Sequence, residues 1–192
     1  PYIRIGSKNM ARISPLYGMT QELSTDEDVA SFLAPHGIQY QRWPIPNEAD
    51  HLASQETLST EEKKTLVECF RAQLDDLEKA SGYTTADIVA LSPNTPGLSD
   101  ALGNFDREHY HTDDEVRFIV DGVGVFGFET KAGRKFTITV EAGDYIVIPA
   151  YAWHWFYMVE GRGIKALRIF KDTNGWTPHY KPSSPVEVAE GI

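Results

Sequence analysis

Residues 103–122 read GNFDREHYHTDDEVRFIVDG, and this stretch decides how the rest of the chain is interpreted. Within it His109, His111 and Glu115 occupy odd positions, so on a continuous strand their side chains would leave the same face. A further histidine, His154, follows another run of alternating hydrophobic residues. Three imidazoles and one carboxylate suit a divalent transition metal ion such as Fe, Ni, Mn or Zn. An ion that prefers more ligands than these would keep positions open for water or substrate, so the pattern predicts a catalytic metal centre.

The second half of the chain has the pattern of a β-rich domain. From about Glu108 onward, β-branched and aromatic residues alternate in short runs separated by turn residues such as Asp121-Gly122. The expected strands are 116–120, 123–128, 136–140, 145–148 and 164–170. Several short strands at close spacing favour a small antiparallel barrel or jelly roll.

The first hundred residues have helical patterns instead. Ser24 with Glu27, and Ser59 with Glu62, match the capping box that begins helices. The first helix should end at Pro35, and the second should run as one long helix to a C-terminal cap at Gly82. The hydrophobic stripe of the second helix is Leu66, Phe70, Leu74 and Leu77. The other elements expected in this half are an extended stretch at 38–43, a polar loop at 47–57 and a short helix at 98–102.

No linker rich in Pro, Gly or Ser divides the two halves, and 192 residues suit one domain. We therefore expect a single domain over 1–192, in which residues 1–102 supply helical elements packed on the barrel, 103–171 form its core and 172–192 form a C-terminal strap.

Composition excludes several classes of protein. The net charge is −10 and the sequence pI is near 5.0, which argues against a nucleic-acid partner. No apolar run approaches the ~18 residues that a membrane span needs, and the first residues lack the apolar stretch of a signal peptide. Cys69 is the single cysteine, so an internal disulfide is impossible and a reducing compartment is indicated. These features predict a cytoplasmic protein, which we expect to be a monomer.

Two segments resemble the sequence motifs of the cupin superfamily. The pattern Gly103-x5-His109-x-His111-x3-Glu115-x6-Gly122 fits the first motif at every defined position. The second motif, Gly143-x5-Pro149-x-Tyr151-x2-His154, departs from the family at Tyr151, where a glycine is usual, and at Met158, where an asparagine is common. The resemblance implies a mainly β fold with α decorations: a cupin double-stranded β-helix, or jelly-roll barrel, with an α-rich N-terminal half.

The chain resembles one cupin family more closely, the acireductone dioxygenases. The strings EHYHTDDEVRFIVDGVGVFGF, DYIVIPAYAWHWF and ALRIFKDTNGW carry the likeness, which covers about residues 38–176. The resemblance implies that the metal ligands are His109, His111, Glu115 and His154. It also implies accessory roles for Glu108 in metal incorporation, for Asp114 in transmitting local conformational change and for Arg117 in generating the substrate dianion. On residue type alone, Asp114 would fit a solvated turn better than a metal ligand.

The family implies an oxidoreductase that uses one Fe²⁺ or Ni²⁺ ion per chain and incorporates both atoms of O2. Its substrate is the acireductone 1,2-dihydroxy-3-oxo-5-(methylthio)pent-1-ene, a small molecule of methionine salvage and so of methionine biosynthesis. The iron form gives formate and 4-methylthio-2-oxobutanoate. The nickel form gives formate, carbon monoxide and 3-(methylthio)propanoate.

Arginines and aromatic residues near the motif are candidates for substrate contact. Arg117 has the parity of Glu115 and should point into the metal cavity, where a guanidinium needs an anion. That anion could be the substrate dianion or a buried carboxylate. Arg168 is a second inward-facing candidate. The methylthio tail needs apolar walls, for which the candidates are Phe118, Phe156, Trp176, Trp155 and Phe170.

Two other classes of function remain open from the sequence. The chain could be another metal-dependent cupin enzyme, either a different dioxygenase or a sugar-phosphate isomerase. An isomerase would need several cations for the phosphate, yet Arg117 is the only one between Glu108 and Lys131. The chain could also be a non-enzymatic metal-binding cupin, but such proteins often lose ligands that this chain keeps.

Overall fold

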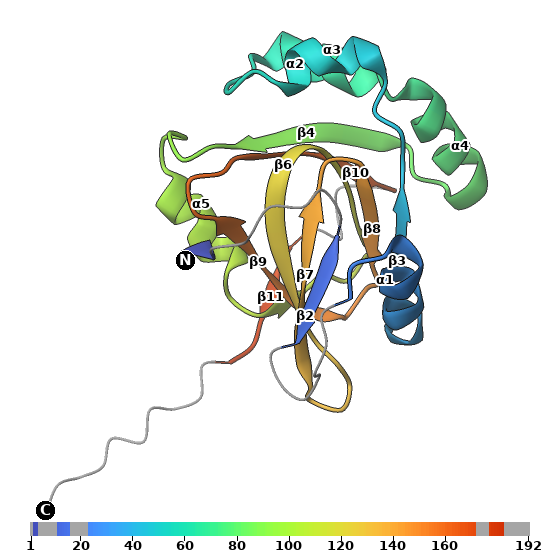
Figure 1. Ribbon diagram of the computed structural model, residues 1–192, viewed down its shortest axis with the longest axis vertical. Coiled ribbons are helices and arrows are strands. Elements are labelled where there is room, and N and C mark those ends of the chain that lie inside the picture. The colour runs from blue at the N-terminus through green and yellow to red at the C-terminus, as the bar shows by residue number, and fades with distance from the viewer. Residues whose placement is uncertain (1, 4–10, 16–22, 172–176, 183–192) are drawn as a thin grey trace, which may run out of the picture.

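One long strand, β6 (Glu115–Glu129), joins the two sheets of a barrel in the computed structural model (Figure 1). The first half of β6 pairs with β8 (Asp144–Ile148) and β10 (Ile164–Phe170), and its second half pairs with β7 (Lys135–Glu141) and β9 (Trp153–Val159). The outer strands are β3 (Gln39–Arg42) on β8, β4 (Thr85–Leu91) on β10, β2 (Arg12–Pro15) on β7, β1 (Tyr2–Ile3) and β5 (His109–Tyr110) on β9, and β11 (His179–Tyr180) on β5. The structure describes residues 2–3, 11–15, 23–171 and 177–182. The predicted β-barrel is confirmed.

The centre of β6 corrects the expectation of two strands with a turn between them. The chain continues as a strand through Asp121 and Gly122, and Gly122 has a φ of 83°. A Cβ atom at this glycine would lie 2.1 Å from the carbonyl oxygen of Gly163. The residue therefore bends β6 from one sheet into the other at a point where only glycine fits.

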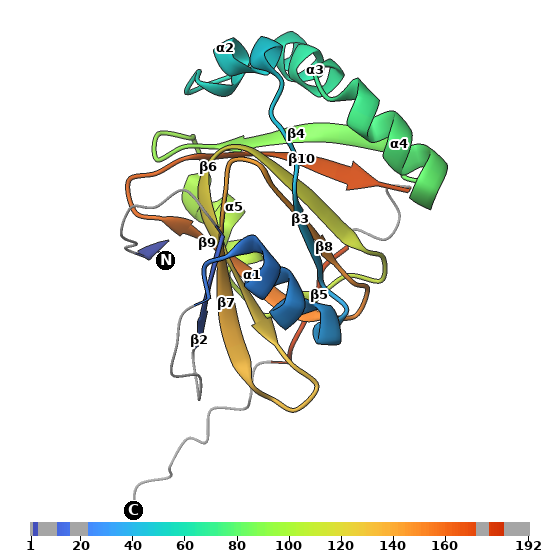
Figure 2. The same cartoon turned by 45° about the vertical axis from the view of Figure 1, so that its right-hand side comes forward.

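Helices cover the outside of the barrel. The helices α2 (Asp50–Ala53), α3 (Thr60–Glu68) and α4 (Arg71–Ser81) lie over the sheet that contains β4 and β10 (Figure 2). On the other parts of the barrel, α1 (Asp26–Leu33) with η1 (Ala34–His36) packs beside β3, and α5 (Leu98–Phe105) packs beside β9. None of the helices in the described part of the chain is long and apolar enough to cross a membrane.

Three details of the helical half differ from the sequence prediction. The N-cap of α1 is Thr25, whose side chain accepts a hydrogen bond from the Asp28 backbone, so the cap is one residue later than Ser24. The long helix predicted from Ser59 is two helices, because the chain leaves helical geometry at Phe70 (φ −105°, ψ 17°). The segment predicted as a polar loop contains η2 (Asn47–Ala49) and α2. The capping box at Ser59 and the left-handed cap at Gly82 are confirmed.

The sheet built on β8, β6 and β10 has one hydrophobic cluster on its inner face and another on its outer face. Ile119, Ile146 and Ala166 face the inside of the barrel, where they meet the second sheet. Their neighbours in the chain, such as Phe118 and Leu167, face outward against the helices. This alternation also fixes where the polar side chains go, so that Arg117 shares the inner face with Ile119.

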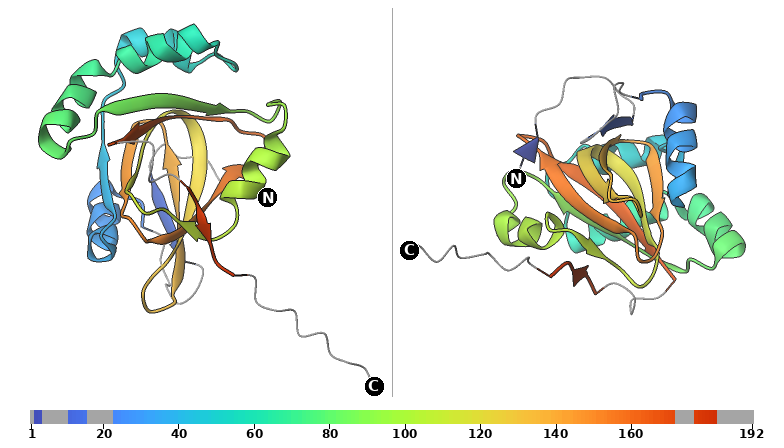
Figure 3. Two further views of the ribbon diagram at one scale, coloured as in Figure 1. Left: turned by 180° about the vertical axis from the view of Figure 1, so that it is seen from behind. Right: turned by 90° about the horizontal axis from the view of Figure 1, so that it is seen from below.

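The C-terminal strap predicted at 172–192 lies mostly outside the described residues. Its described part forms β11, the red strand near the C-terminal end of the chain in Figure 3. This strand pairs with β5, and the register puts Tyr180 opposite His109. Lys181 continues this contact by donating its backbone N–H to the Glu108 carbonyl at 3.1 Å. The short strand that carries His109 is therefore bordered by β9 on one side and β11 on the other.

Candidate metal centre

Four buried side chains, from three strands and one loop, converge on one point. His109 on β5 is directly opposite His154 on β9, Glu115 begins β6, and His111 lies in the connection between β5 and β6. The four ligand atoms all lie within 4.8 Å of one another. Glu115 Oε2 is 3.1 Å from His111 Nε2 and 3.3 Å from His154 Nε2. The structure therefore brings together all four predicted metal-ligating residues.

The path between these residues is not the continuous strand that their parity predicts. The strand β5 ends at Tyr110, and β6 begins only at Glu115. The intervening loop is fixed by backbone contacts, among them a 2.8 Å hydrogen bond that the Tyr151 N–H donates to the His111 carbonyl. Tyr151 itself has a φ of 65°, a left-handed conformation that explains why glycine is usual at this position of the cupin motif.

Two of the imidazoles, those of His109 and His154, are oriented by contacts between their Nδ1 atoms and backbone carbonyl oxygens. His109 Nδ1 is 2.7 Å from the Arg107 carbonyl oxygen, and His154 Nδ1 is 2.8 Å from the Ala152 carbonyl oxygen. A carbonyl oxygen only accepts, so Nδ1 is the donor in each ring, and in the neutral form of the ring Nε2 turns a lone pair toward the cluster. This arrangement is typical of histidines that bind metals.

The protonation states suit a cation. Burial, assisted by repulsion from His154, lowers the pKa of His109 to about 4, so this imidazole is neutral at pH 7. Burial by itself would raise the pKa of Glu115, but Arg117 and the neighbouring imidazoles hold this pKa well below its usual range. A neutral imidazole and an ionised carboxylate are the forms that bind a divalent ion. The donor set and its geometry therefore fit a divalent metal ion.

Arg117 lies beside the cluster, as its parity predicts. Its Nη2 atom is 3.2 Å from Glu115 Oε1, and its Nη1 atom donates to the Val116 carbonyl at 3.1 Å. The residue is 8% exposed, and this burial lowers its pKa while Glu115 opposes the shift. Of the two anions considered for Arg117 from the sequence, the buried carboxylate is present as Glu115. Because Glu115 is also a candidate metal ligand, Arg117 lies next to the place where a substrate anion would bind.

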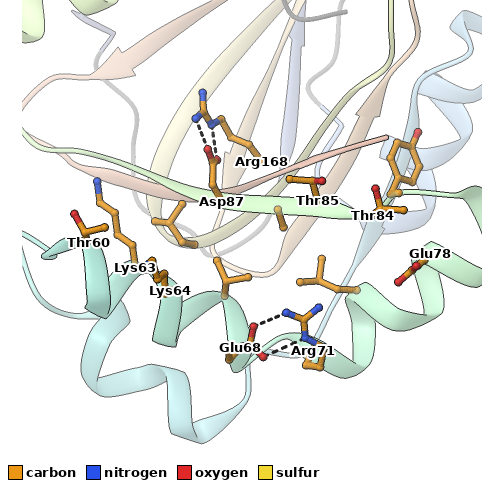
Figure 4. A pocket seen from close by; sticks show the side chains of 15 residues that line it. Thr60, Lys63, Lys64, Glu68, Arg71, Glu78, Thr84, Thr85, Asp87 and Arg168 are labelled. Carbon is orange, nitrogen blue, oxygen red and sulfur yellow. Dashed lines mark hydrogen bonds and ion pairs between the residues drawn. The ribbon is translucent and has the colours of Figure 1, made fainter. Parts of the chain in front are cut away.

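Arg168 lies on the inner face of β10, directly opposite Arg117 in the strand register. It forms a two-pronged ion pair with Asp87 of β4, with Nε 2.6 Å from Oδ1 and Nη2 2.5 Å from Oδ2. Figure 4 shows the two side chains pointing toward each other on the side of β4 away from α3 and α4. Asp87 was missed from the sequence because no strand was expected at 85–91; the short hydrophobic run at 88–91, which includes the β-branched Ile88 and Val89, could have revealed it.

Asp114 joins separate loops around the site. Its carboxylate accepts hydrogen bonds from the Ala150 N–H at 3.0 Å and from the Tyr83 hydroxyl at 3.1 Å. The first contact ties the loop of His111 to the segment that precedes His154. The second ties it to the end of the helical layer, a connection that the sequence did not suggest.

Glu108 lies outside the cluster, in a group of alternating charges. Its carboxylate pairs with Lys135 and, at 2.6 Å, with Lys181, and both lysines also contact Glu129. This group connects the C-terminal segment at Lys181 to β6, to β7 and to the residue before His109.

Three of the aromatic residues predicted to contact substrate have different positions relative to the metal cluster. Phe156 faces the inside of the barrel, where its ring packs edge-on against Phe126 with the centroids 5.1 Å apart. Phe118 is on the opposite face of its strand, packed against Trp43 and Phe70, so the structure does not bring it to the metal cluster. Trp176 lies outside the described residues.

Comparison with known proteins agrees with this geometry. Residues 19–178 match the family model described as the ARD/ARD' family. Acireductone dioxygenase from Leptospira interrogans is 43% identical over 89% of this chain and 96% of its own, and that from Bacillus subtilis is 39% identical over 84% and 91%. A solved structure, acireductone dioxygenase from Bacillus anthracis with a cadmium ion in its active centre, superposes with a TM-score of 0.82 at 37% identity, covering 91% of this chain and 100% of its own. The chain therefore belongs to the acireductone dioxygenase family.

Proposed function

We propose that this protein is a metal-dependent dioxygenase that cleaves the acireductone 1,2-dihydroxy-3-oxo-5-(methylthio)pent-1-ene with O2. The observation that carries the proposal is the buried cluster of three histidines and Glu115, with the Arg117 guanidinium 3.2 Å from the same carboxylate. A cation site next to a buried guanidinium suits a substrate that must bind as an anion through two oxygens.

The residues that would hold one Fe²⁺ or Ni²⁺ ion are His109, His111, Glu115 and His154. When bound, such an ion supplies Lewis acidity that stabilises the deprotonated ene-diol and brings it together with O2. The divalent affinity of nitrogen and oxygen sites rises from iron to nickel, so the supply of each metal decides which one is loaded.

The protein's own groups hold and shield the substrate. Arg117 stabilises the negative charge of the dianion, and because it stays protonated it does not accept the substrate's protons. Phe156 supplies apolar surface inside the barrel for the methylthio tail, and Arg168 is a second substrate contact. We assign Asp114 to the transmission of local conformational change, which its bonds to Ala150 and Tyr83 support, and Glu108, the chain neighbour of His109, to metal incorporation.

The products follow from the bound metal in this proposal. Iron gives formate and 4-methylthio-2-oxobutanoate, the precursor of methionine, and nickel gives formate, carbon monoxide and 3-(methylthio)propanoate. The cellular role is then methionine salvage in the cytoplasm, carried out by a monomer.

The direct test uses the full chain, stripped of metal and reloaded separately with Fe²⁺ or Ni²⁺. Acireductone is added without oxygen, oxygen is then admitted, and oxygen uptake and carbon monoxide are measured. We expect uptake with both metals and carbon monoxide only with nickel. Absence of uptake with both metals would reject the function.

A further inference from the structure

Two arginines lie side by side on the inner face of the sheet, next to the candidate metal centre. Arg117 of β6 and Arg168 of β10 are direct partners in the strand register, so both side chains leave the same face of the sheet. Like charges directly opposite each other on neighbouring strands are destabilising unless other groups offset them. The inner face must therefore hold a negative charge that stabilises both guanidinium groups.

Among the described residues, each guanidinium has a carboxylate partner at an adjoining position. Arg117 pairs with Glu115 at 3.2 Å, and Arg168 pairs through two atoms with Asp87, which is directly opposite it on β4. Figure 4 shows this second pair standing above β4, separate from the side chains of α3. Glu115, Arg117, Arg168 and Asp87 thus form a row of two cations and two anions among the described residues.

The balance changes when the metal centre is filled, because Glu115 is one of its ligands. A divalent cation leaves the row with a surplus of two positive charges, which is the charge that a substrate dianion neutralises. The two ion pairs differ in burial. The side chains of Arg117 and Glu115 are 9% and 7% exposed, whereas those of Arg168 and Asp87 are 34% and 46% exposed. Arg168 is therefore the more exposed of the two arginines, and it lies beside Arg117, where both guanidinium groups can contact the dianion.

We infer that Asp87 is a positioning residue for substrate binding: its two-pronged pair with Arg168 holds the guanidinium in the orientation that binds the acireductone dianion. This inference rests on the proposed function. Asp87 itself touches no substrate, and its effect depends on geometry, because a carboxylate by itself repels an anion. The ion pair can orient the guanidinium because this group is planar and directional, whereas the ammonium of a lysine acts as a point charge.

The test measures anaerobic binding of acireductone to the nickel-loaded protein, followed by the absorbance of the bound dianion, together with metal content and kcat against KM. Arg168→Gln should weaken binding by about 10- to 100-fold, the range for losing one hydrogen bond to a charged group. Asp87→Asn and Arg168→Lys should both weaken it by about tenfold, mainly through KM, with metal content unchanged. The matched control is Asp121→Asn, since Asp121 is also 46% exposed and also pairs with a cation of β10, Lys165, at 3.1 Å.

The outcomes separate the possible roles of Asp87. If Asp87 acted only through its charge, Asp87→Asn would tighten binding, and if it were only structural, binding per folded and metal-loaded protein would not change. Either result overturns the inference, as does binding by Arg168→Lys equal to that of the wild type. If the wild-type protein gives neither a bound-dianion spectrum nor oxygen uptake, the proposed function fails as well.

Discussion

Removal of the Tyr83 hydroxyl tests whether the helical layer supports the metal loop. This hydroxyl donates to Asp114 Oδ2 at 3.1 Å in a partly buried contact, and the other carboxylate oxygen accepts from the Ala150 N–H at 3.0 Å. Tyr83→Phe keeps the ring in the hydrophobic cluster beneath the helices and removes only the hydrogen bond. A hydrogen bond to a charged group contributes about 1.5–3 kcal/mol, so we expect the free energy of unfolding to fall by about 1.5 kcal/mol.

The assay is urea denaturation of the metal-free protein, followed by metal titration of the same variant. The expected change in the urea midpoint should come with weaker metal binding, because Asp114 connects the loop of His111 to the segment before His154. Tyr145→Phe is the matched control: it is buried in the same cluster, and no hydrogen bond of its hydroxyl is seen among the described residues. Equal stability and equal metal affinity for Tyr83→Phe and the wild type would refute the reasoning.

Three further predictions concern other parts of the molecule. Arg117→Ala should keep the metal but lose the bound-dianion spectrum, and normal turnover would make its role structural. Gly127→Ala should lower the melting temperature, because its Cβ would lie 2.0 Å from the Trp155 ring and overpacking costs ~1–3 kcal/mol; an unchanged melting temperature would contradict this. Burial raises the pKa of Asp144 to about 6. The protonated form is therefore favoured by folding, and this contribution is full below about pH 4 and lost as pH rises through 6. The stability of the wild type relative to Asp144→Asn should fall over that range, and a difference independent of pH would disprove the shift.

The metal centre could be predicted from the sequence because its ligands occupy fixed spacings in a short stretch. His109, His111 and Glu115 converge even though the loop between β5 and β6 replaces the expected strand. Their convergence depends on the loop's contacts with distant residues such as Tyr151, which spacing alone does not reveal.

The surroundings of the site were less predictable for a different reason. Asp87 lies on β4 and Tyr83 two residues before that strand, and both are more than twenty positions upstream of His109. Only the antiparallel pairing of β4 with β10 brings Asp87 to Arg168. Phe118 was named as a candidate substrate contact although the parity that turns Arg117 inward puts Phe118 on the opposite face, where it packs against the helices.

The break between α3 and α4 shows the limit of periodicity. Leu66, Phe70 and Leu74 follow helical spacing and are all buried in the same cluster. The helices nevertheless separate at Phe70, where no proline or glycine marks a boundary. Both helices bury the same stripe against the sheet, so tertiary packing, which the local pattern does not record, decides where the chain changes direction.

The central claim is that His109, His111, Glu115 and His154 hold one catalytic metal ion. It is tested most directly by the metal content of the reconstituted wild type, His109→Ala and His154→Ala, with His51→Ala as a control on an exposed histidine. We expect one equivalent of Fe²⁺ or Ni²⁺ in the wild type and the control, and little in the other two variants while they remain folded. One tightly bound equivalent in His109→Ala or His154→Ala would contradict it.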